Sequence, residues 1–200
     1  MSTIFTTRKQ LRTALAVLAV AALPVAAVAV PSAVAKTTTG TAAQASAATC
    51  STHWGSLREA KIRPSLAALT GVRTGRHACF DRIVFDVAGK GVGYDVSYVK
   101  NVYQDGSGFL VPLRGGAKLQ IIVHGPAYDD AGRPTYRPAN RKELTNVSGY
   151  RTFRQVASGG SFEGQTTIGL GVRARLPFRV FTLAGPGSHS RIVVDVAHRW

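Results

Sequence analysis

The sequence has few acidic residues and few cysteines. Its 200 residues include 25 Lys and Arg but only 10 Asp and Glu, which gives a formal charge of +15. Two cysteines are too few for a disulfide-dense miniprotein, and no Cys-x-x-Cys pair or Cys and His cluster is present to hold zinc. With 45% hydrophobic residues the chain is too apolar for a disordered basic tail. We therefore expect one folded basic domain that needs no metal and no cofactor.

The N-terminal segment has the pattern of an export signal. Basic residues precede an uncharged stretch at 13–30, and the small-x-small triplet Ala33-Val34-Ala35 follows it. This pattern predicts a signal peptide at 1–35, cleaved after Ala35. An uncleaved anchor is the alternative, because about 20 apolar residues can span a bilayer. Both interpretations place the rest of the chain outside the cytoplasm, attached to a membrane only if the segment is kept.

The basic excess persists beyond the signal segment. Residues 36–200 carry 22 Lys and Arg against 10 Asp and Glu, a formal charge of +12. Nucleic acid is scarce outside the cytoplasm, whereas the phosphates and carboxylates of a cell wall are abundant. The charge therefore favours an anionic polymer of the cell envelope as the partner.

Export also determines how the two cysteines are interpreted. Outside the reducing cytoplasm two lone cysteines usually pair, so we expect a disulfide between Cys50 and Cys79. A catalytic thiol is the alternative. Residues 36–50 contain no large apolar side chain and are expected to form a flexible linker, followed by the domain at 51–200.

Alternating apolar residues indicate β-structure from residue 80 onward. In the run 80–87, Ile83, Phe85 and Val87 face one way and polar residues mostly face the other. Because Gly and Pro turns separate such runs and no amphipathic helix competes, the pattern predicts an all-β sandwich or barrel. Further strands are expected at 94–103, 117–124, 148–157, 166–172, 178–183 and 191–197.

Three segments stand out from this pattern. Residues 50–63 have mixed character and predict an irregular lead-in, with Trp54 as an anchor. The break at 125–146 predicts a long loop that is either functional or mobile. Residues 82–88 and 191–197 match at six of seven positions. The match reflects either common strand composition or a pseudo-symmetric sandwich with one such strand in each sheet, with Arg and Asp forming cross-strand pairs.

Five motifs of the domain are distinctive: GRHACFDRIVFDV (Gly75 to Val87), GYDVSYV (Gly93 to Val99), DGSG (Asp105 to Gly108), the Gly164 to Leu183 stretch and RIVVDVAHRW (Arg191 to Trp200). In this order they resemble the AMIN-like domain of exported proteins from high-GC Gram-positive bacteria. The resemblance covers the chain from about Trp54 to the C-terminus. It implies a β-sandwich of two small sheets and a role in envelope targeting or wall binding, but it brings no established binding residues.

Enzyme chemistry finds little support in the sequence. Ser107 lies among glycines but outside the strand-to-helix setting of a nucleophile elbow, so a turn is the better interpretation. The five histidines are scattered without metal-ligand spacing, and Asp129-Asp130 suits a turn. The glycines at 164, 169 and 171 indicate bulges or close sheet packing instead of a phosphate loop. We therefore expect no catalytic residues.

Basic and aromatic residues are the better candidates for binding. Arg173 and Arg175 lie on one side of an extended segment with Arg179 just beyond it, and guanidinium groups suit carboxylates and phosphates. A solvated basic face is the alternative. We expect a non-catalytic module that binds peptidoglycan or an associated anionic polymer; a scaffold that docks an envelope protein is the second hypothesis, and a hydrolase is the third. The candidate binding residues are Arg173, Arg175, Arg179, Arg151, Arg154, Tyr128 and Tyr136.

Overall fold

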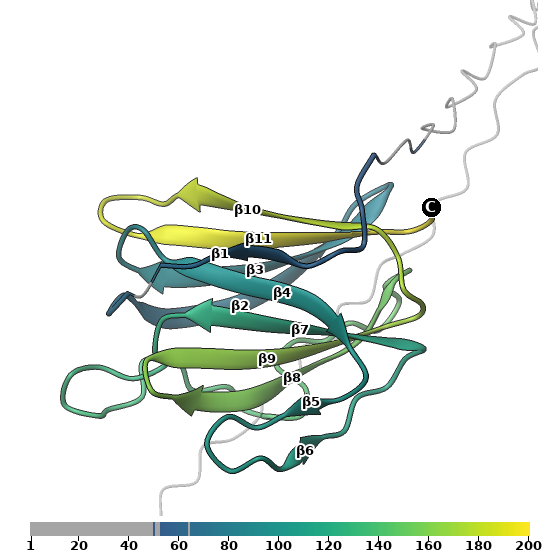
Figure 1. The fold of residues 1–200 in the computed structure, drawn as a ribbon. Helices are drawn as coiled ribbons and strands as arrows, with labels where there is room; N and C mark the ends of the chain where they lie inside the picture. The colour runs from purple at the N-terminus through teal and green to yellow at the C-terminus, as the bar shows by residue number, and fades with distance from the viewer. Residues whose placement is uncertain (1–49, 51–52, 64) are drawn as a thin grey trace, which may run out of the picture. The chain divides into compact units, whose positions relative to one another are not determined.

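The computed structural model describes residues 50, 53–63 and 65–200, and all the regular elements among them are β-strands. Figure 1 shows two main antiparallel sheets packed face to face, as a two-sheet sandwich requires. The predicted all-β sandwich is thus confirmed. The expected signal peptide and linker lie outside the described residues, except for Cys50. No described helix is long and apolar enough to cross a membrane.

The strands form three sheets. The larger sheet has the order β1 (Glu59–Lys61), β4 (Gly93–Val99), β7 (Ala117–His124), β9 (Gln165–Val172) and β8 (Phe153–Phe162). The smaller sheet has the order β10 (Phe178–Ala184), β11 (Ser190–Ala197), β3 (Phe80–Ala88) and β2 (Ala68–Arg76). A short hairpin pairs β5 (Val102–Tyr103) with β6 (Leu110–Val111).

The core lies between the two main sheets. Alternate residues of β3 point into it, and Ile83, Phe85 and Val87 are fully buried, as their spacing predicts. They pack in the same cluster as Leu119 and Ile121 of the opposite sheet. Burial of these aliphatic and aromatic side chains, each contributing about 1.5–3 kcal/mol, is the main force that holds the sheets together.

The repeated strands β3 and β11 are neighbours in one sheet, which corrects the idea of a pseudo-symmetric sandwich with one such strand in each sheet. They pair antiparallel, so that Arg82 lies opposite Asp195 and Asp86 lies opposite Arg191. The expected cross-strand charge pair forms between Arg82 and Asp195, with Nε 2.6 Å from Oδ1.

Several predicted strand boundaries are wrong. The strand expected at 148–157 is β8, which runs from Phe153 to Phe162, and the strand expected at 94–103 is divided into β4 and β5. The lead-in contains β1, and β2 was not predicted at all. Two glycines obscure the alternation in β2, and one of them, Gly71, lies so close to Asp86 that an added Cβ would be 3.2 Å from its carboxylate.

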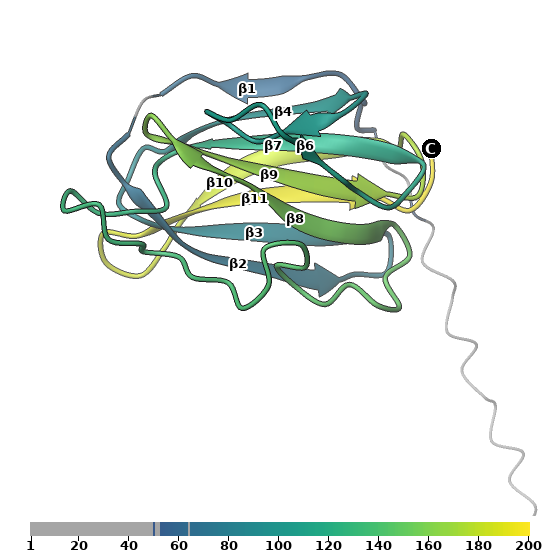
Figure 2. The ribbon, with the colours of Figure 1, turned by 90° about the horizontal axis from the view of Figure 1, so that it is seen from below.

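The lead-in and the long loop close the two open sides of the sandwich. Gly55 accepts a hydrogen bond from Phe178 N, and Glu59 of β1 accepts one from Val180 N, so the lead-in lies along β10. The loop between β7 and β8 spans 125–152 and runs along the opposite side, between β8 and β2 (Figure 2). It bonds to β8 through Leu144 N and to β2 through Thr135.

The strands begin and end at two ends of the sandwich, which are called here the disulfide end and the β8–β9 end. The disulfide end contains the turn between β2 and β3, the starts of β8 and β10, and the end of β11 (Figure 1). The β8–β9 end contains the Glu163-Gly164 turn, the ends of β1 and β7, and the start of β2. Both turn residues have positive φ, a conformation that glycine adopts without strain.

Glycines on the outer face of β9 allow the chain after the β5–β6 hairpin to pack closely. An added Cβ at Gly169 would lie 2.6 Å from the Leu113 side chain, and one at Gly171 would overlap the Arg114 carbonyl. The expected close packing is therefore confirmed at these two positions.

Candidate functional site

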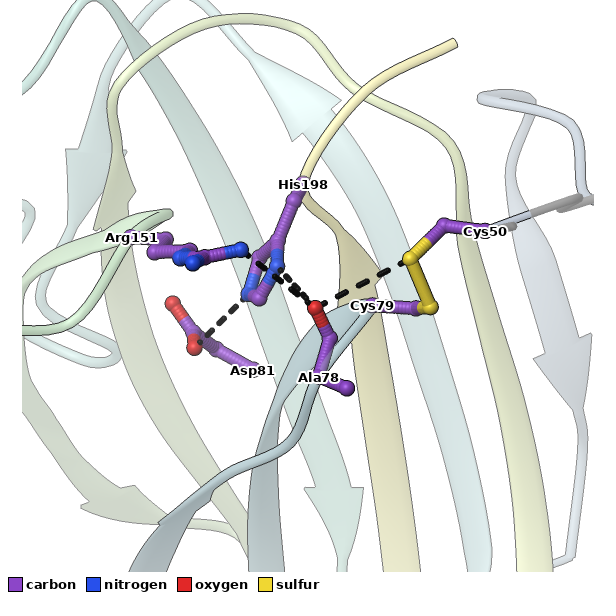
Figure 3. Close-up of a disulfide and its surroundings, with 6 residues drawn as sticks. All are labelled: Cys50, Ala78, Cys79, Asp81, Arg151 and His198. Atoms are coloured by element: carbon purple, nitrogen blue, oxygen red, sulfur yellow. Dashed lines mark hydrogen bonds and ion pairs between the residues drawn. A yellow bond between two sulfur atoms is a disulfide. The ribbon is translucent and has the colours of Figure 1, made fainter. Parts of the chain in front are cut away.

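The predicted disulfide joins Cys50 to Cys79 and ties the lead-in to the start of β3 (Figure 3). Beside it, the carbonyl of Ala78 faces Nδ1 of His198 at 3.2 Å, and it also accepts a 3.5 Å hydrogen bond from Arg151. His198 Nε2 lies 3.1 Å from the Asp81 carboxylate. The C-terminal end of the chain is thereby fastened to the disulfide end.

The His198 and Asp81 pair resembles two members of a catalytic triad, but the other ring nitrogen of His198 faces a backbone carbonyl where a triad has its nucleophile. Asp81 is 1% exposed, and its second oxygen accepts hydrogen bonds from the backbone N–H groups of Thr152 (2.6 Å) and Phe153 (3.1 Å). Both ring nitrogens of His198 face oxygen atoms of the protein, so neither is available to take a proton from a nucleophile. The geometry suits a structural role.

Arg173 and Arg175 extend from the loop between β9 and β10, where each binds a different partner. Arg173 donates a hydrogen bond to the His198 carbonyl. Arg175 donates to the Ser56 carbonyl at 2.9 Å, and its Cζ lies 5.0 Å from the centroid of the Tyr98 ring. Both residues are exposed, yet both guanidinium groups are already bonded within the protein.

Arg179 belongs to an ion-pair cluster on the outer face of the smaller sheet. Its Nε donates to the fully buried Asp195 carboxylate at 2.9 Å, and Arg82 donates to both oxygens of the same carboxylate. The hydrogen bonds to Asp195 raise the pKa of Arg82. Cζ of Arg179 also lies 4.3 Å from the Trp54 ring centroid, so Trp54 anchors the lead-in as expected.

Arg151 and Arg154 lie at the start of β8, and their guanidinium groups bind backbone carbonyls. Arg151 precedes the strand and reaches Ala78, whereas Arg154 lies within it and donates to the carbonyls of Phe153 (2.9 Å) and Tyr150 (3.1 Å). The structure therefore brings all five predicted arginines to the disulfide end, where each one binds a group of the protein itself.

The two predicted tyrosines line a cleft of about 430 Å³ between the long loop and β8. Tyr136 packs against the core cluster, and this burial raises the pKa of its hydroxyl. Tyr128 accepts a hydrogen bond from Gly164 N at 3.1 Å, which orients its ring. Apolar side chains, including Leu69 and Ile168, form part of the lining. The cleft thus combines an apolar surface with two held aromatic rings.

Two arginines of the long loop, Arg137 and Arg141, also line this cleft. Both are exposed, and neither guanidinium has a hydrogen-bond or ion-pair partner among the described residues. Arg133, four residues earlier, differs because it pairs with Asp129 at 2.8 Å. Neither Arg137 nor Arg141 was predicted as a binding residue, although the sequence shows both at four-residue spacing beside the two tyrosines.

This combination suits an anionic ligand with an apolar or sugar-like face. A guanidinium donates two parallel hydrogen bonds to a carboxylate or phosphate, and a tyrosine ring packs on apolar CH groups. Among the described residues no group of three or more His, Cys, Asp or Glu side chains is placed to hold a metal ion.

The comparisons with known proteins give one finding. The family model for the AMIN-like domain matches residues 67–198, about two-thirds of the chain. Neither the curated proteins nor the solved structures contain a match. AMIN-like domains typically occur in exported cell-wall proteins, and the disulfide fits an extracellular location.

Proposed function

Because the chain belongs to the AMIN-like domain family, we propose that it is a non-catalytic module of the cell envelope that binds peptidoglycan or an attached anionic polymer. The family supports a cell-wall-related role. The proposal adds the ligand class and the place where it binds. Both rest on the cleft, where the guanidinium groups of Arg137 and Arg141 have no partner among the described residues.

The cleft is better suited to the ligand than the predicted arginines at the disulfide end. A ligand that binds Arg173, Arg175 or Arg179 must displace a hydrogen bond that already exists in the protein, whereas at Arg137 and Arg141 it displaces only water. Displacing the internal hydrogen bond leaves a carbonyl or carboxylate of the protein without its partner, and that cost lowers the net free energy of binding.

The test is retention of the protein on purified insoluble peptidoglycan, with and without its attached anionic polymer, across a salt series. Replacing both Arg137 and Arg141 by Gln should weaken retention about tenfold or more, since a hydrogen bond to a charged group contributes roughly 1.5–3 kcal/mol. Retention of the unmodified protein should also fall with salt.

The matched control is the double variant Arg173→Gln with Arg175→Gln, which removes the same charge from bonded guanidinium groups. We expect its retention to change little. An equal loss in both variants would show that net charge alone drives binding, and a loss confined to the control would place the site at the disulfide end. No retention on either material would contradict the proposal and favour the scaffold that docks an envelope protein.

A further inference from the structure

Large apolar side chains are exposed at the β8–β9 end. Leu66 and Ile62 are 85% and 66% exposed, and they line an open pocket with the β8–β9 turn. Phe162, which ends β8, and Phe109 of the β5–β6 hairpin are 45% and 70% exposed. The hairpin lies close to Phe162, because a Cβ at Gly106 would be 3.1 Å from its ring. Such a group of exposed apolar residues marks an interaction surface.

Cationic side chains adjoin these residues. Lys61 and Arg63 flank Ile62 in sequence, and Lys90 lines a neighbouring pocket with Lys61. Arg63 packs beside Gly91, where an added Cβ would lie 3.6 Å from Nη1. None of the three cations has a hydrogen-bond or ion-pair partner among the described residues.

The unpaired acidic side chains at this end lie in other segments than the three cations. Glu163 lines the apolar pocket in the β8–β9 turn, Asp105 lies in the β5–β6 hairpin, and Asp130 lies on the exposed tip of the long loop. Asp129 is already paired with Arg133. Ile62 and Leu66 are therefore bordered by cations that have no partner among the described residues, whereas Glu163 and Asp105 lie near Phe162 and Phe109.

We propose that the β8–β9 end docks on the surface of a bilayer that contains anionic phospholipid. Leu66, Ile62, Phe109 and Phe162 enter the boundary between headgroups and acyl chains, while Lys61, Arg63 and Lys90 contact lipid phosphates. Exposed apolar side chains bordered by Lys and Arg are the pattern of interfacial membrane binding, in which apolar insertion and attraction to anionic lipids act together. The long stems of the cations let their charges reach the headgroups.

The docking surface and the cleft use different residues. A protein held at the membrane by its β8–β9 end therefore does not use Arg137 or Arg141 for docking, and both stay available to a ligand in the cleft. Removing these two guanidinium groups should leave membrane docking unchanged.

The test uses the full chain with vesicles and a local tryptophan reporter at Leu66. The two native tryptophans lie at the disulfide end, where Trp54 contacts Phe80 and Trp200 donates to the Arg175 carbonyl. Leu66→Trp should therefore report on the β8–β9 end alone, whatever part of the chain first brings the protein to the vesicle. With phosphatidylglycerol vesicles that carry brominated acyl chains, its quenching should exceed that of the native protein about threefold.

Two controls define the result. Leu57→Trp places a reporter at a residue of similar exposure, 78%, on the far side of β1, and it should not be quenched. In the Leu66→Trp background, changing Lys61, Arg63 and Lys90 to Gln should abolish the additional quenching. The proposal is overturned if the Leu66→Trp reporter shows no additional quenching on anionic vesicles, if phosphatidylcholine alone gives the same quenching, or if the Leu57→Trp reporter responds equally.

Discussion

The five predicted arginines of the disulfide end and the two arginines of the cleft differ in what surrounds them. At the disulfide end, strands and turns terminate and leave carbonyl groups without ladder partners, and those of Ala78, His198 and Ser56 accept hydrogen bonds from arginine side chains. Beside the cleft, two of the loop carbonyls accept hydrogen bonds from β8: Arg141 O accepts from Ser158 N, and Lys142 O accepts from Gln155 Nε2. Exposure alone therefore does not show whether an arginine is open to a ligand, because the acceptors within its reach also matter.

Removing the disulfide tests how far the two regions are independent, and it should have the largest effect. Replacing both Cys50 and Cys79 by Ala opens a loop with a sequence separation of 29 residues. In the chain-entropy model this lowers the free energy of unfolding by about 3–4 kcal/mol. Chemical denaturation of the oxidised protein and the variant measures the difference.

The same variant should keep its retention on peptidoglycan under conditions where it is folded. The cleft is fastened separately, through the bonds of the long loop to β8 and β2. A folded variant that no longer binds would show that the disulfide end takes part in the site.

Asp195 gives the next largest effect, because it holds two of the bonded arginines. Asp195→Ala removes a fully buried carboxylate from Arg82 and Arg179, whose side chains are 25% and 41% exposed. Losing one partner of a buried ion pair costs about 3–5 kcal/mol, and we expect roughly 3 kcal/mol here since both guanidinium groups can still reach water. Denaturant unfolding provides the measurement.

Asp86 supplies the matched control. It pairs with Arg73 in the same sheet, but its side chain is 33% exposed and the ion pair is solvated. Asp86→Ala should cost about 1 kcal/mol or less. Equal losses of unfolding free energy in Asp195→Ala and Asp86→Ala would mean that burial of the carboxylate does not decide how much an ion pair stabilises this sheet. A gain in peptidoglycan retention by Asp195→Ala would show that freeing a guanidinium is sufficient to create a binding site.

Local pattern predicted the parts of this fold that depend on neighbours in sequence. The alternation in β3 correctly predicted that Ile83, Phe85 and Val87 are buried. The expected export of the chain correctly predicted the disulfide between its two cysteines. The partner of each strand depends on contacts far along the chain, so the sequence left open whether the repeat of β3 in β11 meant one such strand in each sheet, and that alternative was wrong. Glycines concealed β2, since a residue without a side chain carries no alternation.

The binding residues show the same limit. Tyr128 and Tyr136 were predicted from their place in the long loop, and both line the cleft. The sequence could not rank the arginines, because a guanidinium is bonded or unbonded according to carbonyls supplied by distant segments. Arg173 meets the carbonyl of a residue 25 positions away, whereas Arg141 meets none among the described residues.

The smallest expected effect is the pH dependence of stability that comes from His124 at the β8–β9 end. His124 lies beside Ile62 and Leu66 at the β8–β9 end, and its burial lowers its pKa from the ordinary value of 6.5, although Asp95 acts weakly in the opposite direction. The folded protein therefore binds this proton less tightly than the unfolded chain does. The contribution of His124 to stability should be complete above about pH 6.5 and should be lost as the pH falls toward its lowered pKa.

Replacing His124 by Gln removes this titration while retaining a polar side chain. Compared with the native protein, the variant should lose less stability as the pH falls from about 7 to 5, the interval in which an ordinary histidine gains its proton. Denaturant unfolding at a series of pH values measures the difference between the two curves. A difference that stays constant over this interval would contradict a desolvated imidazole at the β8–β9 end. A difference of the opposite sign would mean that the charge of Asp95 raises the pKa of His124 by more than burial lowers it. The β8–β9 end would then influence this histidine mainly through charge instead of through exclusion of water.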